Sequence, residues 1–110
     1  MTASFAEILN ALPSADHIHA LELIDASGHT VARLENKPGS AGSVRVYAAL
    51  AAEFGVINAQ AAERGLALFA EHTAAARAHP GSHPNIDRLL ALVGTMQGYT
   101  AKVFEKIPEA

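Results

Sequence analysis

The chain has 110 residues and a formal charge of -3, and half of its residues are hydrophobic. It contains no cysteine, which excludes disulfides, thiolate metal sites and cysteine nucleophiles. The basic residues are scattered and no apolar run approaches the ~20 residues of a membrane span, so we expect binding to neither nucleic acid nor membrane. The first basic residue is Arg33, so no basic start of a signal peptide is seen and we expect one cytoplasmic domain over residues 1–110.

A short helix is predicted near the start of the chain. Ser4 and Glu7 have the spacing of a capping box, in which each side chain accepts a hydrogen bond from a free N–H at the helix start. The apolar residues that follow fall on one helical stripe: Phe5, Ile8, Leu9 and Leu12. Pro13 is the expected end of this helix.

Residues 18–36 are predicted to form a β-hairpin with a three-residue loop that ends at Gly28. The register expected from this loop pairs Asp25 with His29, Leu23 with Val31 and Leu21 with Arg33. Apolar residues then lie on both faces of the hairpin: Leu21, Leu23 and Val31 on one, and Ile18, Ile24 and Leu34 on the other. We therefore expect the hairpin to be covered on more than one side.

The middle of the chain is predicted to be helical. A Pro/Gly/Ser loop over residues 37–43 leads into a helix over 44–54, and a longer helix covers 57–78. The segment 79–84 breaks the chain, because a residue before proline avoids the helical region. Asn85 is the expected N-cap of the last helix. The apolar stripe of that helix is Ile86, Leu89, Leu90, Val93 and Met96.

Alternating apolar residues over 99–107 predict a third strand, which would support the hairpin. The predicted fold class is therefore α+β, with a small antiparallel sheet packed by about four α-helices. The many alanines allow helices to approach closely, either within the domain or between two copies.

Four segments carry a resemblance to a known family. They are residues 36–39 (NKPG), 46–50 (VYAAL), 68–73 (LFAEHT) and 83–89 (HPNIDRL). The chain resembles a family of short uncharacterised bacterial proteins from residue 5 to about residue 93. That family has no assigned activity, so the resemblance implies a compact single domain and adds no chemistry.

Six histidines raise the hypothesis of a metal site, and their spacing limits it. His17, His19 and His29 surround the hairpin. In the predicted register His29 is opposite Asp25, and His19 lies six residues before Asp25 on the same strand. At ~3.3 Å per residue these histidines are about 20 Å apart, so the three cannot share one ion. We interpret them as surface residues, with His19 opposite Glu35.

His72, His79 and His83 bracket the break before the last helix. With Asp87 or Glu71 as an oxygen ligand, three imidazoles suit zinc or another divalent metal, the one cofactor that we consider. The spacing matches no known metal motif, and seven residues of continuous helix separate His72 from His79 by ~10.5 Å. The alternative is structural, with His72 as a hydrogen-bonded core residue and the other two histidines at helix ends.

The loop after the hairpin is a candidate anion site. Free N–H groups at a helix start suit phosphate or carboxylate, and a glycine backbone lets the ligand approach them. The residues expected to bind are Lys37, Gly39, Ser40, Gly42, Ser43 and Arg45. The segment lacks both the Walker motif and the dinucleotide Gly-x-Gly-x-x-Gly motif, so the alternative is an ordinary loop with Ser43 as the helix cap.

The sequence does not determine the function, and two hypotheses remain open. The first is an interaction or regulatory module that forms a homodimer, because no catalytic constellation is visible and both hairpin faces are apolar. The second is a small-ligand or metal-dependent protein, or an enzyme, with its site near His72, His79, His83 and the segment 37–45. A pocket shared by His72, His83 and the loop 37–43 would favour the second hypothesis.

Overall fold

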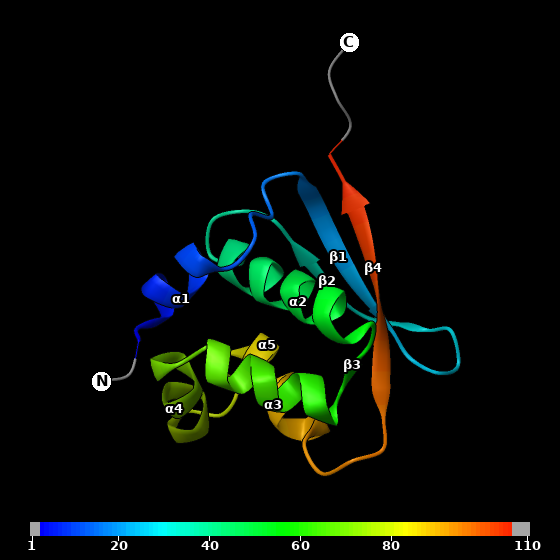
Figure 1. The fold of residues 1–110 in the computed structure, drawn as a ribbon. Helices are drawn as coiled ribbons and strands as arrows, with labels where there is room; N and C mark the ends of the chain where they lie inside the picture. Colours follow the sequence, from blue (N-terminus) through cyan, green and yellow to red (C-terminus); the bar gives the residue numbers. More distant parts are fainter. Residues whose placement is uncertain (1–2, 107–110) are drawn as a thin grey trace.

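A computed structural model describes residues 3–106 and shows an α+β fold (Figure 1). This part of the chain contains four antiparallel strands, where three were predicted, and five helices, where about four were predicted. The helices are α1 (Phe5–Ala11), α2 (Ala41–Phe54), α3 (Ala59–Leu68), α4 (Glu71–Ala78) and α5 (Pro84–Leu92). The predicted fold class is confirmed. No helix within residues 3–106 is long and apolar enough to span a membrane.

The sheet has the strand order β2-β1-β4-β3. Its strands are β1 (Ile18–Ile24), β2 (Thr30–Glu35), β3 (Ile57–Asn58) and β4 (Gly98–Glu105). The predicted third strand is therefore β4, although Ile107 at its predicted end lies outside the described residues. The two-residue β3 was not predicted, and it pairs with the first two residues of β4.

The hairpin forms as predicted, but its register is different. Leu21 faces Leu34, one residue from the predicted partner, and a β-bulge returns the ladder to Ile24 opposite Thr30. A bulge sets two residues against one, so it reverses the face to which the following side chains point. Leu34 consequently lies in the core, while Val31 is 44% exposed.

The hairpin loop is closed by Asp25. Its carboxylate accepts the backbone N–H groups of Ser27 and His29, both at 2.9 Å. Gly28 has a φ of 88°, the left-handed conformation that the loop type predicts. The register change also places Glu35 opposite Ala20 and not opposite His19 as predicted.

The helices cover one face of the sheet, so the expectation of cover on both sides of the hairpin is wrong (Figure 1). The other face carries an ion pair between Glu22 and Arg33, with N and O 3.0 Å apart. The Phe104 ring on this face lies 5.3 Å from the Arg33 guanidinium and 5.2 Å from the Lys102 ammonium. Charged side chains therefore shield the apolar groups here.

The predicted helix over 57–78 is divided into three elements. Ile57 belongs to β3, and the Asn58 side chain accepts the N–H of Ala61 and caps α3. Between α3 and α4, Ala70 has a φ of 51°, which ends one helix and starts the other. The Thr73 hydroxyl donates to the Leu66 carbonyl across this break. The hydrophobic period alone did not reveal these two interruptions.

The helix ends also differ from those predicted. The capping box at Ser4 is confirmed. The helix α2 begins at Ala41, three residues early, and α5 begins with Pro84 at its first position, where the missing N–H costs nothing. Asn85 is therefore inside α5 and is not its cap. The helix α5 ends at Leu92, so Val93 and Met96 lie beyond it and are exposed.

Candidate functional site

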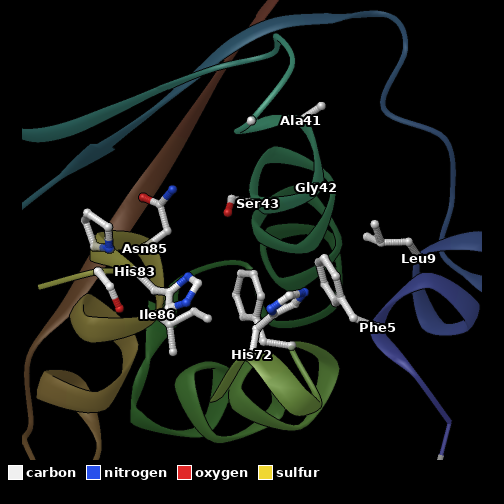
Figure 2. A pocket seen from close by; sticks show the side chains of 13 residues that line it. Phe5, Leu9, Ala41, Gly42, Ser43, His72, His83, Asn85 and Ile86 are labelled. Carbon is white, nitrogen blue, oxygen red and sulfur yellow. The ribbon is translucent and has the colours of Figure 1, made fainter. Parts of the chain in front are cut away.

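A pocket of about 440 Å³ lies where α1, α2, α4 and α5 meet (Figure 2). This volume is typical of small-molecule sites. Both His72 and His83 line it, together with Gly39 and Gly42 from the predicted anion loop. We call it the His72/His83 pocket. It brings together parts of the two candidate sites that the sequence had suggested separately.

The two histidines come from neighbouring helix starts. His72 lies in the first turn of α4, and His83 directly precedes α5. The loop after α4 turns the chain back, so that the centroids of the two imidazole rings are 5.8 Å apart. His72 also packs edge-on against Phe5, with ring centroids 4.9 Å apart. Within residues 3–106, the side-chain hydrogen bonds near these rings join other groups and involve neither imidazole. Both imidazoles are therefore available to a ligand.

The first turn of α2 adds hydrogen-bond donors. Two backbone N–H groups of this turn already have acceptors: the N–H of Ala41 donates to the Lys37 carbonyl, and that of Val44 donates to the Ser40 carbonyl. Those of Gly42 and Ser43 lie between them at the positive end of the helix dipole, with no backbone acceptor among the described residues. In Figure 2 the Ser43 hydroxyl lies on the pocket side of α2. The Ser43 hydroxyl therefore shares the pocket with the two imidazoles.

The side-chain amide oxygen of Asn85 is bound by Arg88, which leaves the amide nitrogen free to act as a donor. The Arg88 Nη1 donates to Asn85 Oδ1 at 2.9 Å and to the Tyr47 hydroxyl at 3.1 Å. Since an arginine can only donate, the atom that it meets must be the amide oxygen. The amide NH₂ of Asn85 is thus left for the pocket, which this residue lines.

The Tyr47 hydroxyl completes this support. It donates to the main-chain carbonyl of Asn85, and its side chain is fully buried. Burial raises the pKa of Tyr47 to about 12, although the nearby Arg88 guanidinium acts in the opposite direction. The tyrosine therefore stays protonated and fixes the start of α5 against α2.

An apolar wall closes the other side of the pocket. It is formed by Phe5 and Leu9 of α1 together with Phe69, whereas Ile86 lies beside His83. The rings of Phe5 and Phe69 stack with centroids 5.4 Å apart. A Cβ at Gly42 would lie 3.3 Å from the Phe5 ring, so glycine allows α1 to approach α2 closely.

A single hydrogen bond ties α1 to the start of α4. The backbone N–H of Phe5 donates to Glu71 Oε1 at 2.8 Å. The pKa of the Glu71 carboxyl is lowered because this carboxylate accepts hydrogen bonds from its own backbone N–H and from that of Phe5. Glu71 is exposed and does not line the pocket, whose lining contains no aspartate or glutamate.

The predicted anion-binding residues are only partly brought together. Gly39, Gly42 and Ser43 line the His72/His83 pocket. Lys37 instead pairs with Glu35, with N and O 3.3 Å apart, and the Ser40 hydroxyl donates to the Glu35 carbonyl. Arg45 donates to the carbonyls of the two residues that follow α1, so it holds that segment and not a ligand.

The predicted metal ligands are also divided. His72 and His83 meet, whereas His79 is exposed at the end of α4 and Asp87 accepts the N–H of Gly81. Within residues 3–106, no group of three or more histidine, aspartate or glutamate side chains is placed to hold a metal ion. The three histidines around the hairpin are exposed, as expected.

Comparison with known proteins identifies a family. Residues 5–103 match a family described as an uncharacterized protein conserved in bacteria (DUF2322). The chain belongs to this family. The match confirms the resemblance seen in the sequence, and the DUF2322 family brings no assigned activity with it. No curated protein and no solved structure matches the chain.

Sequence reasoning assigned five of the thirteen residues that line the pocket in this DUF2322 protein, and Phe5, Leu9 and Asn85 are among those that it missed. Phe5 and Leu9 were placed on the stripe of a short helix, with no indication of what that stripe would face. Asn85 was predicted as a helix cap because asparagine is common there. The pair His83-Pro84 was the available signal, since proline at the first helical position shifts Asn85 inside α5.

Proposed function

We propose that this DUF2322 protein binds a small organic anion in the His72/His83 pocket. The observation that carries the proposal is the meeting of donors from three segments in a pocket without carboxylates. The two imidazoles, the Ser43 hydroxyl and the Asn85 amide line this pocket and are all able to donate to an acidic group. A metal ion would instead require acidic or further imidazole ligands around the two histidines.

The pocket also indicates the shape of the ligand. In Figure 2 the side chains of His83, Asn85 and Ser43 lie on one side and those of Phe5 and Leu9 on the other, with the His72 imidazole packed edge-on against Phe5. A ligand with one acidic group and one apolar or aromatic part would satisfy both sides, because buried apolar surface adds about 25 cal/mol per Å² to binding. Phenyl phosphate has these two parts and is a suitable probe.

Thermal unfolding with matched ligands tests the proposal. Phenyl phosphate at ten times its dissociation constant is expected to add about 1.4 kcal/mol to the free energy of unfolding, which raises Tm by roughly 5–10 °C. Inorganic phosphate and benzoate should each give smaller shifts. The proposal is wrong if phenyl phosphate does not raise Tm, or if it raises the Tm of a pocket variant equally.

Two variants and one control assign the binding to the pocket. His83→Ala removes an imidazole before α5, and Ser43→Ala removes a hydroxyl in the first turn of α2; both residues line the pocket. Each should weaken phenyl phosphate binding about tenfold, the factor expected from one charge-assisted hydrogen bond of about 1.5 kcal/mol. His79→Ala is the matched control, since this histidine is exposed and lies outside the pocket.

Binding is also expected to depend on pH. Histidine is the side chain that gains positive charge between pH 8 and pH 5. Benzenesulfonate keeps its charge over this range, so its affinity should rise as the pH falls. The rise should be reduced in His72→Ala and retained in His79→Ala. An affinity that is independent of pH in the unmodified protein would remove the imidazoles from the proposed role.

Self-association and a cytoplasmic location stay predictions. The hairpin faces, on which the expectation of self-association rested, do not support it, because the helices cover one of them and charged side chains the other. The edge of β4 that β3 leaves unpaired beyond Tyr99 does support it. Location is tested by fractionating bacterial cells that express the tagged chain. Recovery in the membrane or periplasmic fraction would contradict the prediction.

A further inference from the structure

The strand β4 has an open hydrogen-bonding edge. One edge pairs with β1 along the strand, but on the other edge β3 pairs only with Gly98 and Tyr99. From Thr100 to Glu105, no strand within residues 3–106 covers that edge. Unpaired N–H and C=O groups in an exposed row are a template for another strand.

The backbone groups that point outward can be assigned. Lys106 donates its N–H to the His17 carbonyl, on the β1 side. Backbone groups alternate between the two edges of a strand, so the N–H and C=O groups of Ala101, Val103 and Glu105 point away from β1. Val103 is 42% exposed, and its side chain lies on the helix-covered face because it is opposite the core residue Leu21.

We propose that two copies of this chain pair through β4, antiparallel and centred on Val103. This register pairs Ala101 with Glu105 of the partner subunit, and Val103 with Val103 of the partner subunit. Every outward-facing residue then exchanges its backbone hydrogen bonds. The two sheets form one continuous sheet around a twofold axis, which is the usual symmetry of soluble homodimers.

The charges along β4 select this register. Shifting the centre to residue 102 places Lys102 against its own copy, and shifting it to residue 104 places Lys102 against Lys106 of the partner subunit. Like charges directly opposite each other destabilise a strand pair. Centred on Val103, Lys102 instead faces Phe104 of the partner subunit. The same two residues already interact within one chain, with Lys102 Nζ 5.2 Å from the Phe104 ring centroid.

The occupant is a second copy and not an unrelated peptide, because the edge is complementary to itself. The pairing places the exposed Val103 against the same valine of the partner subunit. The charges that this edge requires in its partner are those that β4 itself carries. It stops at Ala101, before the two residues that pair with β3. It is also independent of the His72/His83 pocket, whose lining contains no residue of β4.

A single engineered cysteine tests the register, since the natural chain has none. In an antiparallel hydrogen-bonded pair the Cα atoms lie ~5.5 Å apart, within disulfide range. Val103→Cys should therefore form a disulfide-linked dimer rapidly under mild oxidation. Val31→Cys is the matched control, at a similarly exposed valine on the far strand β2. Equal crosslinking of the two variants would indicate random collision and would overturn the proposal.

A proline variant tests the pairing without oxidation. Val103→Pro removes an N–H that points outward and leaves the β1 ladder intact, as tolerated at strand edges. The unmodified chain should sediment as a dimer at high concentration, and Val103→Pro as a monomer. Val31→Pro should remain dimeric. A monomeric unmodified chain, or a dimer that survives Val103→Pro, would overturn the proposal. Neither result would affect phenyl phosphate binding, so the two proposals are tested separately.

Discussion

The hydroxyl of Tyr47 supports both the core and the pocket, so its removal should have a large effect. It is fully buried, donates to the Asn85 carbonyl and accepts from Arg88. Tyr47→Phe deletes this single oxygen and leaves both partners without that contact. Leaving buried groups unpaired costs about 1–3 kcal/mol. Arg88 keeps its bond to the Asn85 side chain, so we expect a loss of about 2 kcal/mol and a Tm lower by roughly 10 °C.

The same hydroxyl makes stability sensitive to alkaline pH. Burial raises the pKa of Tyr47 to about 12, whereas an unfolded tyrosine has a pKa near ~10. The protonated form therefore favours the native state. This contribution is fully present below about pH 10 and is lost as the pH rises toward about 12. This rise of the Tyr47 pKa from about 10 to about 12 corresponds to about 3 kcal/mol.

Urea unfolding of the unmodified protein and of Tyr47→Phe, repeated between about pH 8 and pH 11, measures this difference. All other titrating groups are common to the two chains, so the gap between their free energies of unfolding isolates Tyr47. We expect the gap to shrink as the pH rises above about 10. A gap that stays constant, or one close to zero at pH 8, would refute the assignment of a buried, hydrogen-bonded hydroxyl.

Further stability predictions concern packing, the hairpin loop and the first helix. A Cβ at Gly65 would lie 2.7 Å from Leu89 and 2.9 Å from Leu50. Overpacking by about 1–3 kcal/mol exceeds the ~1 kcal/mol gain in helix propensity, so Gly65→Ala should lower Tm, and a higher Tm would contradict this close packing. Asp25→Ala removes two hydrogen bonds in the loop and should cost about 1 kcal/mol in urea unfolding; no loss would contradict the closed loop. Ser4→Ala should speed amide exchange in α1, and unchanged exchange would argue against the capping box.

Local signals in the sequence were sufficient for most of the fold. The capping box at Ser4 and the loop ending at Gly28 both act over a few residues, and the structure has each of them. The hairpin register could not be predicted, because the bulge sets two residues of one strand against one of the other and no residue in the sequence marks its position. The break at Ala70 was hidden for a similar reason, since an alanine gives no sign of a positive φ.

The site was predicted in parts. The sequence suggested that His83 and the segment 37–45 carry chemistry; His83 lines the pocket, but only Gly39, Gly42 and Ser43 of the suggested binding residues in that segment do. Spacing along the chain could not show that the loop after α4 brings His83 to His72, or that Arg45 is occupied by carbonyls near α1. The Arg45 contacts join segments more than thirty residues apart, and the two histidines meet only because the chain between them turns back.

The most direct test of the anion pocket is a nuclear magnetic resonance titration with phenyl phosphate. We predict saturable shifts of the backbone N–H signals of Gly42 and Ser43 and of the imidazole signals of His72 and His83. The signals of His79 should not change. Shifts that do not saturate, or that centre outside the pocket, would contradict the proposed function.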